Sequence, residues 1–224
     1  MTFDQSEYDL RCAWGLAGVH LLAPVSDVVI IVDVLRFSTA VDVALSQGAS
    51  VRPRHWNASR DAGTSPLSPS ALQSIPTGAT LVMPSPNGST LAMHASCTAA
   101  TFTACLRNCR AVADCARKHG SRIAVIPAGE RWPDGSLRPA IEDLIGSGAV
   151  LAALPGRPSP EAEIAIAAFE HFRGNLRDAL MRCSSGKELI ARGLASDVEL
   201  ASDYSISRAV PILREGRFVD FSGT

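Results

Sequence analysis

The segment from Val28 to Gly48 constrains the fold of this chain more than any other. An apolar run, VVIIV, leads into Asp33, then into a short turn with Arg36, and then into a helical pattern opened by Ser38 and Thr39. An unbroken run of β-branched residues is typical of a parallel strand buried on both faces. Open α/β sheets bind ligands at the carboxyl ends of such strands, and Asp33 lies at that end.

The turn after this strand offers groups that bind anions. The first N–H groups of a helix have no partner inside the helix, and the hydroxyls of Ser38 and Thr39 are expected to face the same crevice. Arg36 adds a forked guanidinium donor. The segment therefore predicts phosphate-binding groups beside Asp33, which could ligate a metal or orient a water molecule.

The order of strand followed by helix recurs along the chain. Further strands are predicted at 49–52, 80–84, 99–103, 122–127, 209–213 and 217–221, and helices at 91–95, 109–119, from 139 onward, 159–173, 176–182, 186–192 and 197–202. This alternation predicts a three-layer α/β/α fold with a largely parallel or mixed central sheet. We expect one domain over 1–224, with an irregular loop at about 53–79 that is either a mobile lid or a plain surface excursion.

Composition narrows the class of partner. The formal charge is -1 and no basic stripe occurs, so the sequence predicts binding neither to nucleic acid nor to a membrane surface. The polar N-terminus and the lack of a long apolar run predict a cytoplasmic protein without a membrane span. Six cysteines without a CxxC pair favour reduced thiols over disulfides or zinc. A small anionic molecule is the expected partner, and a homodimer is left open.

Polar residues follow four of the predicted strands. In chain order they are Asp33 with Arg36, Asn87 with Gly88, Arg107 with Asn108, and Glu130. Because parallel strands end at one edge of a sheet, we expect these groups to converge on one site. The Asn87-Gly88 pair alone also fits a tight turn before a capped helix.

Three carboxylates are predicted to hold Mg²⁺, which prefers oxygen ligands and keeps several waters. They are Asp33, Glu130 and either Glu142 or Asp143. The last two residues also fit an ordinary role as acids in the first turn of a helix, where the helix dipole stabilises each by about 0.3 to 1 kcal/mol.

Several catalytic templates are absent from the sequence. Asp33 lacks the second Asp of a DxD phosphatase, no cysteine has an arginine six positions later, and only the tail of a P-loop occurs, at 184–187. No complete dinucleotide-binding fingerprint, GxSxG elbow or HExxH motif is present. His20 and His55 could carry protons, but a surface position explains each more simply.

Five motifs together resemble the 2-phosphosulfolactate phosphatase (ComB-like) family. They are DVLRFSTA at 33–40, SPNGST at 85–90, CLRN at 105–108, IPAGE at 126–130 with Glu142 and Asp143, and SSGKELIARG at 184–193. The resemblance implies an α/β/α phosphatase that uses Mg²⁺ on the phosphomonoester of a small sulfonated hydroxy acid, on a route toward coenzyme M.

The resemblance also implies which positions form the site. The strand-turn-helix motif of the family matches Asp33, Arg36, Ser38 and Thr39, and its Asn-Gly turn matches Asn87 and Gly88. The Asn after the next strand matches Asn108, and the later acidic positions match Glu130, Glu142 and Asp143. The C-terminal motif includes Ser185, Gly186 and Asp197.

The leading hypothesis is therefore metal-assisted hydrolysis of a small phosphomonoester. Asp33 is expected to be catalytic, and Arg36 and Arg107 are expected to neutralise developing charge, because one helix terminus supplies only about 1 kcal/mol. Two alternatives stay open. One is a nucleotide-dependent transferase or oxidoreductase, and the other is a noncatalytic binder of phosphorylated or sulfonated metabolites.

Overall fold

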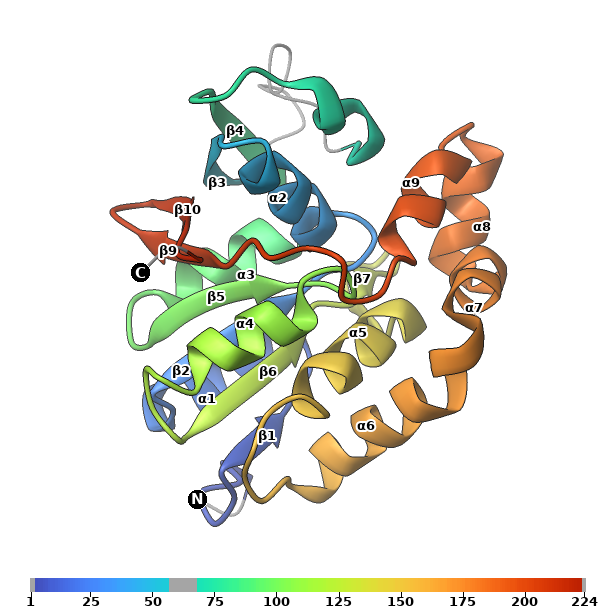
Figure 1. Cartoon of the computed structure of the whole chain (residues 1–224). Helices are drawn as coiled ribbons and strands as arrows, with labels where there is room; N and C mark the ends of the chain where they lie inside the picture. Colours follow the sequence, from blue (N-terminus) through green and yellow to red (C-terminus); the bar gives the residue numbers. More distant parts are fainter. Residues whose placement is uncertain (1–2, 57–67, 223–224) are drawn as a thin grey trace.

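The computed structural model of the chain describes residues 3–56 and 68–222 (Figure 1). Within these residues, eight strands form the main sheet in the order β1-β6-β2-β5-β9-β10-β3-β4, and a separate hairpin pairs β7 with β8. The strands are β1 (Leu10–Cys12), β2 (Val28–Val32), β3 (Ser50–His55), β4 (Thr80–Ser85), β5 (Ala100–Ala104), β6 (Ile123–Pro127), β7 (Glu130–Arg131), β8 (Leu137–Arg138), β9 (Pro211–Arg214) and β10 (Arg217–Asp220).

Both α-helices and short 3-10 helices connect these strands. The α-helices are α1 (Gly15–Leu22), α2 (Phe37–Ser46), α3 (Gly88–Ala95), α4 (Cys109–Ala116), α5 (Ile141–Leu151), α6 (Pro160–Phe172), α7 (Leu176–Arg182), α8 (Ser184–Ala191) and α9 (Ala195–Ala201). Three short 3-10 helices lie in the described residues, namely η1 (Ala23–Val25), η2 (Ser70–Ser74) and η3 (Arg173–Asn175).

The sheet is mixed, as predicted. Strands β1, β6, β2 and β5 run parallel to one another, and β2 lies between β5 and β6. The direction reverses at β9 and again at β10, and β10 is antiparallel to β3. Strands β3 and β4 are parallel to each other, so they run in the opposite sense to β2 along the hydrogen-bonded ladder.

The apolar run of β2 explains the three layers, because alternate residues of a strand point to opposite faces. Val28, Ile30 and Val32 pack into a core with α4 to α9. Val29 and Ile31 pack into a second core with α1, α2 and α3. All five residues are fully buried, and the predicted α/β/α fold is confirmed.

The structure differs from the sequence prediction in several regions, among them the β7–β8 hairpin, which was not predicted. Strand β3 continues to His55, past the expected start of the loop, because its residues pair with β4 along their whole length. Of that loop, residues 57–67 lie outside the described part of the chain, and η2 follows them. The sequence pattern also missed β1 and α1, since β1 has only three residues and no side chain caps α1.

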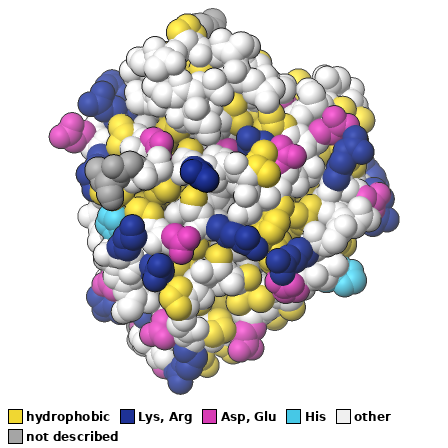
Figure 2. All heavy atoms as spheres, in the orientation of Figure 1, with side chains coloured by type: hydrophobic (Ala, Val, Ile, Leu, Met, Phe, Trp, Pro, Cys, Tyr) yellow, Lys and Arg dark blue, Asp and Glu magenta, His cyan; other side chains and the backbone are white. Residues whose placement is uncertain are grey.

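The surface carries charges of both signs. On the face drawn in Figure 2, basic and acidic side chains are interspersed with apolar ones. Over residues 3–56 and 68–222, none of the helices has both the length and the apolar character needed to cross a membrane.

Candidate active site

Asp33 is buried directly after β2, where the starts of two helices converge on its carboxylate. One oxygen, Oδ1, accepts a hydrogen bond from the backbone N–H of Phe37 at 3.1 Å, and Oδ2 accepts one from the N–H of Gly88 at 3.0 Å. These donors begin α2 and α3, so two positive helix ends face one carboxylate. A Cβ at Gly88 would lie 2.3 Å from the Phe37 ring and 2.8 Å from Asp33 Oδ2, which explains the glycine.

Asn87 joins Asp33 to Glu130. Its side-chain amide donates to Glu130 Oε2 at 2.9 Å, while the next residue, Gly88, binds Asp33. Strand β4, which leads into this turn, runs opposite to β2 in the sheet. The Asn87-Gly88 turn therefore reaches Asp33 because of where α3 lies, and not because β2 and β4 end at the same edge of a parallel sheet.

Two further carboxylates enter from the first turn of α5. Asp143 accepts hydrogen bonds from the N–H of Val34 at 2.7 Å and of Gly129 at 2.9 Å, so it ties the turn after β2 to the turn after β6. Glu142 is also buried and faces the thiol of Cys183. Because both point inward, they do more than complement the helix dipole. We call Asp33, Glu130, Glu142 and Asp143 the carboxylate cluster.

Burial, with a smaller effect of mutual repulsion, raises the pKa of Asp33, Glu130 and Asp143. Burial raises the pKa of Asp33 to about 6, and the charge of Glu142 adds to the effect. Burial, then the charges of Asp33 and Glu142, raise the pKa of Glu130 to about 7. The pKa of Asp143 lies well above its usual value, mainly because of burial. A bound cation would relieve the same repulsion that the protons relieve.

Arg138 supplies positive charge at the edge of the cluster. Its charge lowers the pKa of Glu130, against the larger effect of burial, and its Nη2 donates to the hydroxyl of Ser185 at 3.3 Å. Sequence reasoning missed Arg138, although it stands four residues before Glu142. The predicted Ser185 thus lies near the cluster, at the start of α8.

Gly186 serves packing between helices. A Cβ at this position would lie 1.8 Å from the carbonyl oxygen of Leu180 in α7. Its N–H donates to the sulfur of Cys183 at 3.3 Å. The structure therefore places Gly186 against α7, next to Ser185.

Two predicted hydroxyls stabilise the turn after β2. Ser38 Oγ accepts the N–H of Asp33 at 2.8 Å and lies 2.6 Å from the hydroxyl of Thr103. Thr39 donates its hydroxyl to the carbonyl of Val34 at 2.7 Å. Both side chains are fully buried, so they orient the backbone that carries Asp33.

The predicted arginines bind acidic residues. Arg36 lies close enough to lower the pKa of Asp33, but its Nη1 donates to Asp197 at 2.7 Å. Arg107 binds Asp42 at 2.8 Å and Asp203 at 2.7 Å. The structure thus brings Arg36 to the rim of the cluster and binds Arg107 into a separate ion-pair network.

Asn108 connects the end of β5 to the C-terminal segment. Its Oδ1 accepts the N–H of Cys105 at 2.9 Å, and its Nδ2 donates to the carbonyl of Ala209 at 3.2 Å. The side chain is fully buried. These contacts give Asn108 a role in the backbone structure. Its side-chain hydrogen bonds go to Cys105 and Ala209 and not to the carboxylate cluster.

No preformed cage for a metal is found among residues 3–56 and 68–222. Within them, no group of three or more His, Cys, Asp or Glu side chains is arranged to hold a metal ion. Mg²⁺ is usually bound by only one or two carboxylates, together with water and substrate oxygens. The four carboxylates are hard oxygen donors, so they fit a partial site of that kind.

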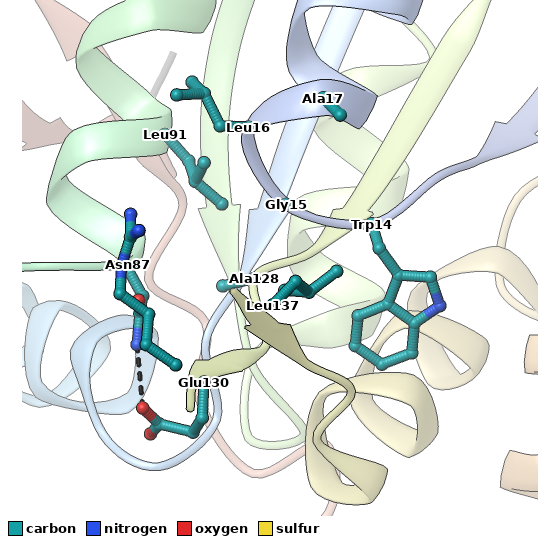
Figure 3. A pocket seen from close by; sticks show the side chains of 10 residues that line it. Trp14, Gly15, Leu16, Ala17, Asn87, Leu91, Ala128, Glu130 and Leu137 are labelled. Carbon is teal, nitrogen blue, oxygen red and sulfur yellow. Dashed lines mark hydrogen bonds between the residues drawn. The ribbon is translucent and has the colours of Figure 1, made fainter. Parts of the chain in front are cut away.

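A pocket of about 180 Å³ adjoins the cluster (Figure 3). Its walls come from the start of α1, from α3 and from the region of β7 and β8. The lining residues are Trp14, Gly15, Leu16, Ala17, Asn87, Leu91, Ala128, Glu130, Arg131 and Leu137. Asn87 and Glu130 therefore belong both to the pocket and to the site around Asp33.

A family model and a curated relative that match this chain carry the same description. A family model described as 2-phosphosulpholactate phosphatase matches residues 58–216. The chain is 32% identical over 140 residues to the 2-phosphosulfolactate phosphatase of Methanothermobacter thermautotrophicus, an alignment that covers 62% of this chain and 58% of that relative.

Two longer alignments involve proteins named probable 2-phosphosulfolactate phosphatase. The chain is 27% identical over 220 residues to the protein of Carboxydothermus hydrogenoformans, covering 85% of this chain and 89% of the relative. It is 30% identical over 232 aligned positions to the protein of Thermus thermophilus, covering 89% of this chain and 92% of the relative.

Proposed function

Because the chain belongs to the 2-phosphosulfolactate phosphatase family, a family of phosphoric monoester hydrolases, we propose that it hydrolyses a small phosphomonoester with the help of Mg²⁺. The substrate we propose is 2-phosphosulfolactate or a related phosphorylated hydroxy acid, and the products are the alcohol and inorganic phosphate. The observation that carries this proposal is the convergence of two helix starts on Asp33, which the Asn87-Gly88 turn joins to Glu130.

Arg138 and the start of α8 are the proposed anion-binding groups. Arg138 already donates to Ser185 and lies near enough to Glu130 to act on its charge. A guanidinium group can bind two phosphate oxygens at once. Arg36 would add positive charge from the rim, held in place by Asp197. Phosphoryl transfer depends mainly on such positioning and charge neutralisation.

Asp33 and Glu142 are the residues that would hold Mg²⁺. Both are buried, and their charges already interact. Asp143 would hold in position the turns after β2 and β6, because it accepts the N–H groups of Val34 and Gly129. When bound, the ion would supply charge neutralisation and favour deprotonation of a water molecule.

Glu130 is the proposed proton donor. Burial is the largest cause that raises its pKa, to about 7 in the metal-free protein, so a useful fraction of the group can carry a proton near neutral pH. A water oxygen bonds to phosphorus, the bond from phosphorus to the ester oxygen breaks, and Glu130 gives its proton to that departing oxygen. The water's proton goes to solvent, from which Glu130 is protonated again. Water is thus added across one P–O bond.

A screen of phosphate release tests this proposal. Inorganic phosphate would be measured over a panel of small phosphorylated hydroxy acids, including phosphosulfolactate, with Mg²⁺ and with a chelator. We expect release with Mg²⁺ and a loss of at least about 100-fold on chelation. If none of the esters releases phosphate but the same esters stabilise the protein, the result would instead support the noncatalytic binder. Stabilisation by ATP or NAD(P) alone would support a nucleotide-dependent enzyme.

A further inference from the structure

Three histidines from separate parts of the chain gather on the surface. His20 lies in the last turn of α1, His94 lies in the last turn of α3, and His55 ends β3. All three residues are exposed. The ring centroids of His20 and His94 are 5.3 Å apart, and those of His55 and His94 are 6.1 Å apart. The group is separate from the carboxylate cluster and from the residues that line the pocket beside it.

The packing of α1 against α3 holds two of these histidines together. Val19 in α1 and Ala95 in α3 are buried in the same core, and they are the chain neighbours of His20 and His94. Because close-packed side chains fix the backbone on both helices, the two imidazole rings stay opposite each other. The fold therefore positions this pair before any ligand binds.

The facing nitrogens are spaced like two ligands of one metal ion. Nε2 of His20 lies 3.4 Å from Nδ1 of His94. Two nitrogens at about 2.0 to 2.1 Å from a tetrahedral ion lie about 3.3 to 3.4 Å from each other. Without an ion, one ring must keep a proton on its facing nitrogen in order to donate to the other. Replacement of this proton by a metal ion would make both facing nitrogens ligands.

Both helices also favour a cation at this place. The last carbonyl groups of a helix have no partner inside the helix and carry partial negative charge. His20 and His94 each lie in the last turn of their helix. The site thus combines two imidazole donors with the negative ends of two helices.

The donor type distinguishes this pair from the carboxylate cluster. Imidazole nitrogens suit Zn²⁺, Cu²⁺ and Ni²⁺, whereas carboxylate oxygens suit Mg²⁺. Since no arrangement of three or more His, Cys, Asp or Glu side chains fits a metal ion within residues 3–56 and 68–222, the pair would hold an ion with water in the other positions. An ion bound in this way can exchange with solvent.

We propose that His20 and His94 form a binding site for a divalent transition-metal cation such as Zn²⁺, which joins α1 to α3. The inference does not depend on the proposed function. Leu16 and Leu91 line the pocket beside the carboxylate cluster, and they precede the two histidines by four and three residues on the same helices. A bound ion would therefore hold two walls of that pocket together.

Calorimetric titration with Zn²⁺ in excess Mg²⁺ tests the site. We expect the parent to bind Zn²⁺, and His20→Gln and His94→Gln each to weaken this binding at least about tenfold, since even loss of a residue that only orients a metal ligand costs about 10- to 100-fold. His171→Gln is the matched control, because His171 is exposed in the last turn of α6. It should bind Zn²⁺ as the parent does.

The double variant His20→Gln, His94→Gln shows whether the two rings hold one ion. If they do, its affinity for Zn²⁺ lies within about threefold of the weaker single variant, because ligands that share an ion are not additive. Zn²⁺ should also raise the Tm of the parent and of His171→Gln but not that of the double variant, since a ligand of the folded state stabilises it.

Three results would overturn the proposal. They are unchanged affinity for Zn²⁺ in both single variants, an equal loss in His171→Gln, and losses that multiply in full in the double variant, which would mean two independent sites. Circular dichroism without metal checks that the variants fold, and exposed positions such as these usually tolerate substitution.

Discussion

Asp33→Asn is expected to lower kcat for phosphate release by about 10³-fold, the range in which loss of a charged catalytic group usually falls. The substitution removes the negative charge on which the starts of α2 and α3 converge. The amide keeps nearly the same volume and removes a charge that is costly to bury, while its NH2 group can no longer accept one of the two backbone N–H groups, so we expect the fold to persist with a lower free energy of unfolding.

The measurement is a phosphate-release assay paired with circular dichroism and thermal unfolding. Asp114→Asn is the matched control, because Asp114 is exposed on α4 and its side chain is 70% accessible. That control should keep the activity of the parent. Turnover unchanged in Asp33→Asn would reject the role of this residue.

The second large effect concerns stability in the absence of metal. We expect the free energy of unfolding to fall by about 3 kcal/mol as the pH rises from about 5.5 to 8, since one pKa unit is worth 1.36 kcal/mol. The pKa of Asp33 is raised to about 6 and that of Glu130 to about 7. Between the unfolded and folded pKa values the folded state holds more protons, so stability declines with pH.

Urea unfolding of the chelated protein at the two pH values measures this effect. In the double variant Asp33→Asn, Glu130→Gln the free energy of unfolding should depend less on pH, since the two substituted side chains do not titrate. Mg²⁺ should restore stability mainly at the higher pH, because metal binding requires deprotonated ligands. Greater stability of the metal-free protein at pH 8 than at pH 5.5 would show that the carboxylates do not repel one another as described.

Local patterns explain what the sequence could predict. The VVIIV run is buried on both faces of the sheet, and the turn after it places Asp33 at the strand end. Each of these features depends on residues close together in the chain. The convergence of Asp33, Asn87, Gly88 and Glu130 was also predicted, but the sense of β4, which runs opposite to β2, was not.

Distant partners explain what the sequence could not predict. An arginine after a strand suits phosphate or a carboxylate equally well, and the choice depends on what the fold brings near it. Arg107 meets Asp42, 65 positions away, and Arg36 meets Asp197, 161 positions away. Neither pairing leaves a periodic or local signal in the sequence.

The pocket was missed for the same reason. Trp14, Leu91 and Leu137 come from three parts of the chain and meet only in the folded protein. Leu137 and Arg138 lie in the two-residue strand β8, which is too short to show an alternating pattern. The same apolar residues would look like ordinary core or surface positions in the sequence.

A double-variant cycle tests most directly the claim that Asp33 and Glu130 act in one site. The values of kcat would be compared for Asp33→Asn, for Glu130→Gln and for the two together, with Mg²⁺ at saturation. Because groups that act as a unit show strongly nonadditive losses, we predict that the double variant lies within about threefold of the poorer single variant. Losses that multiply in full would show that the two carboxylates act independently and would contradict the account.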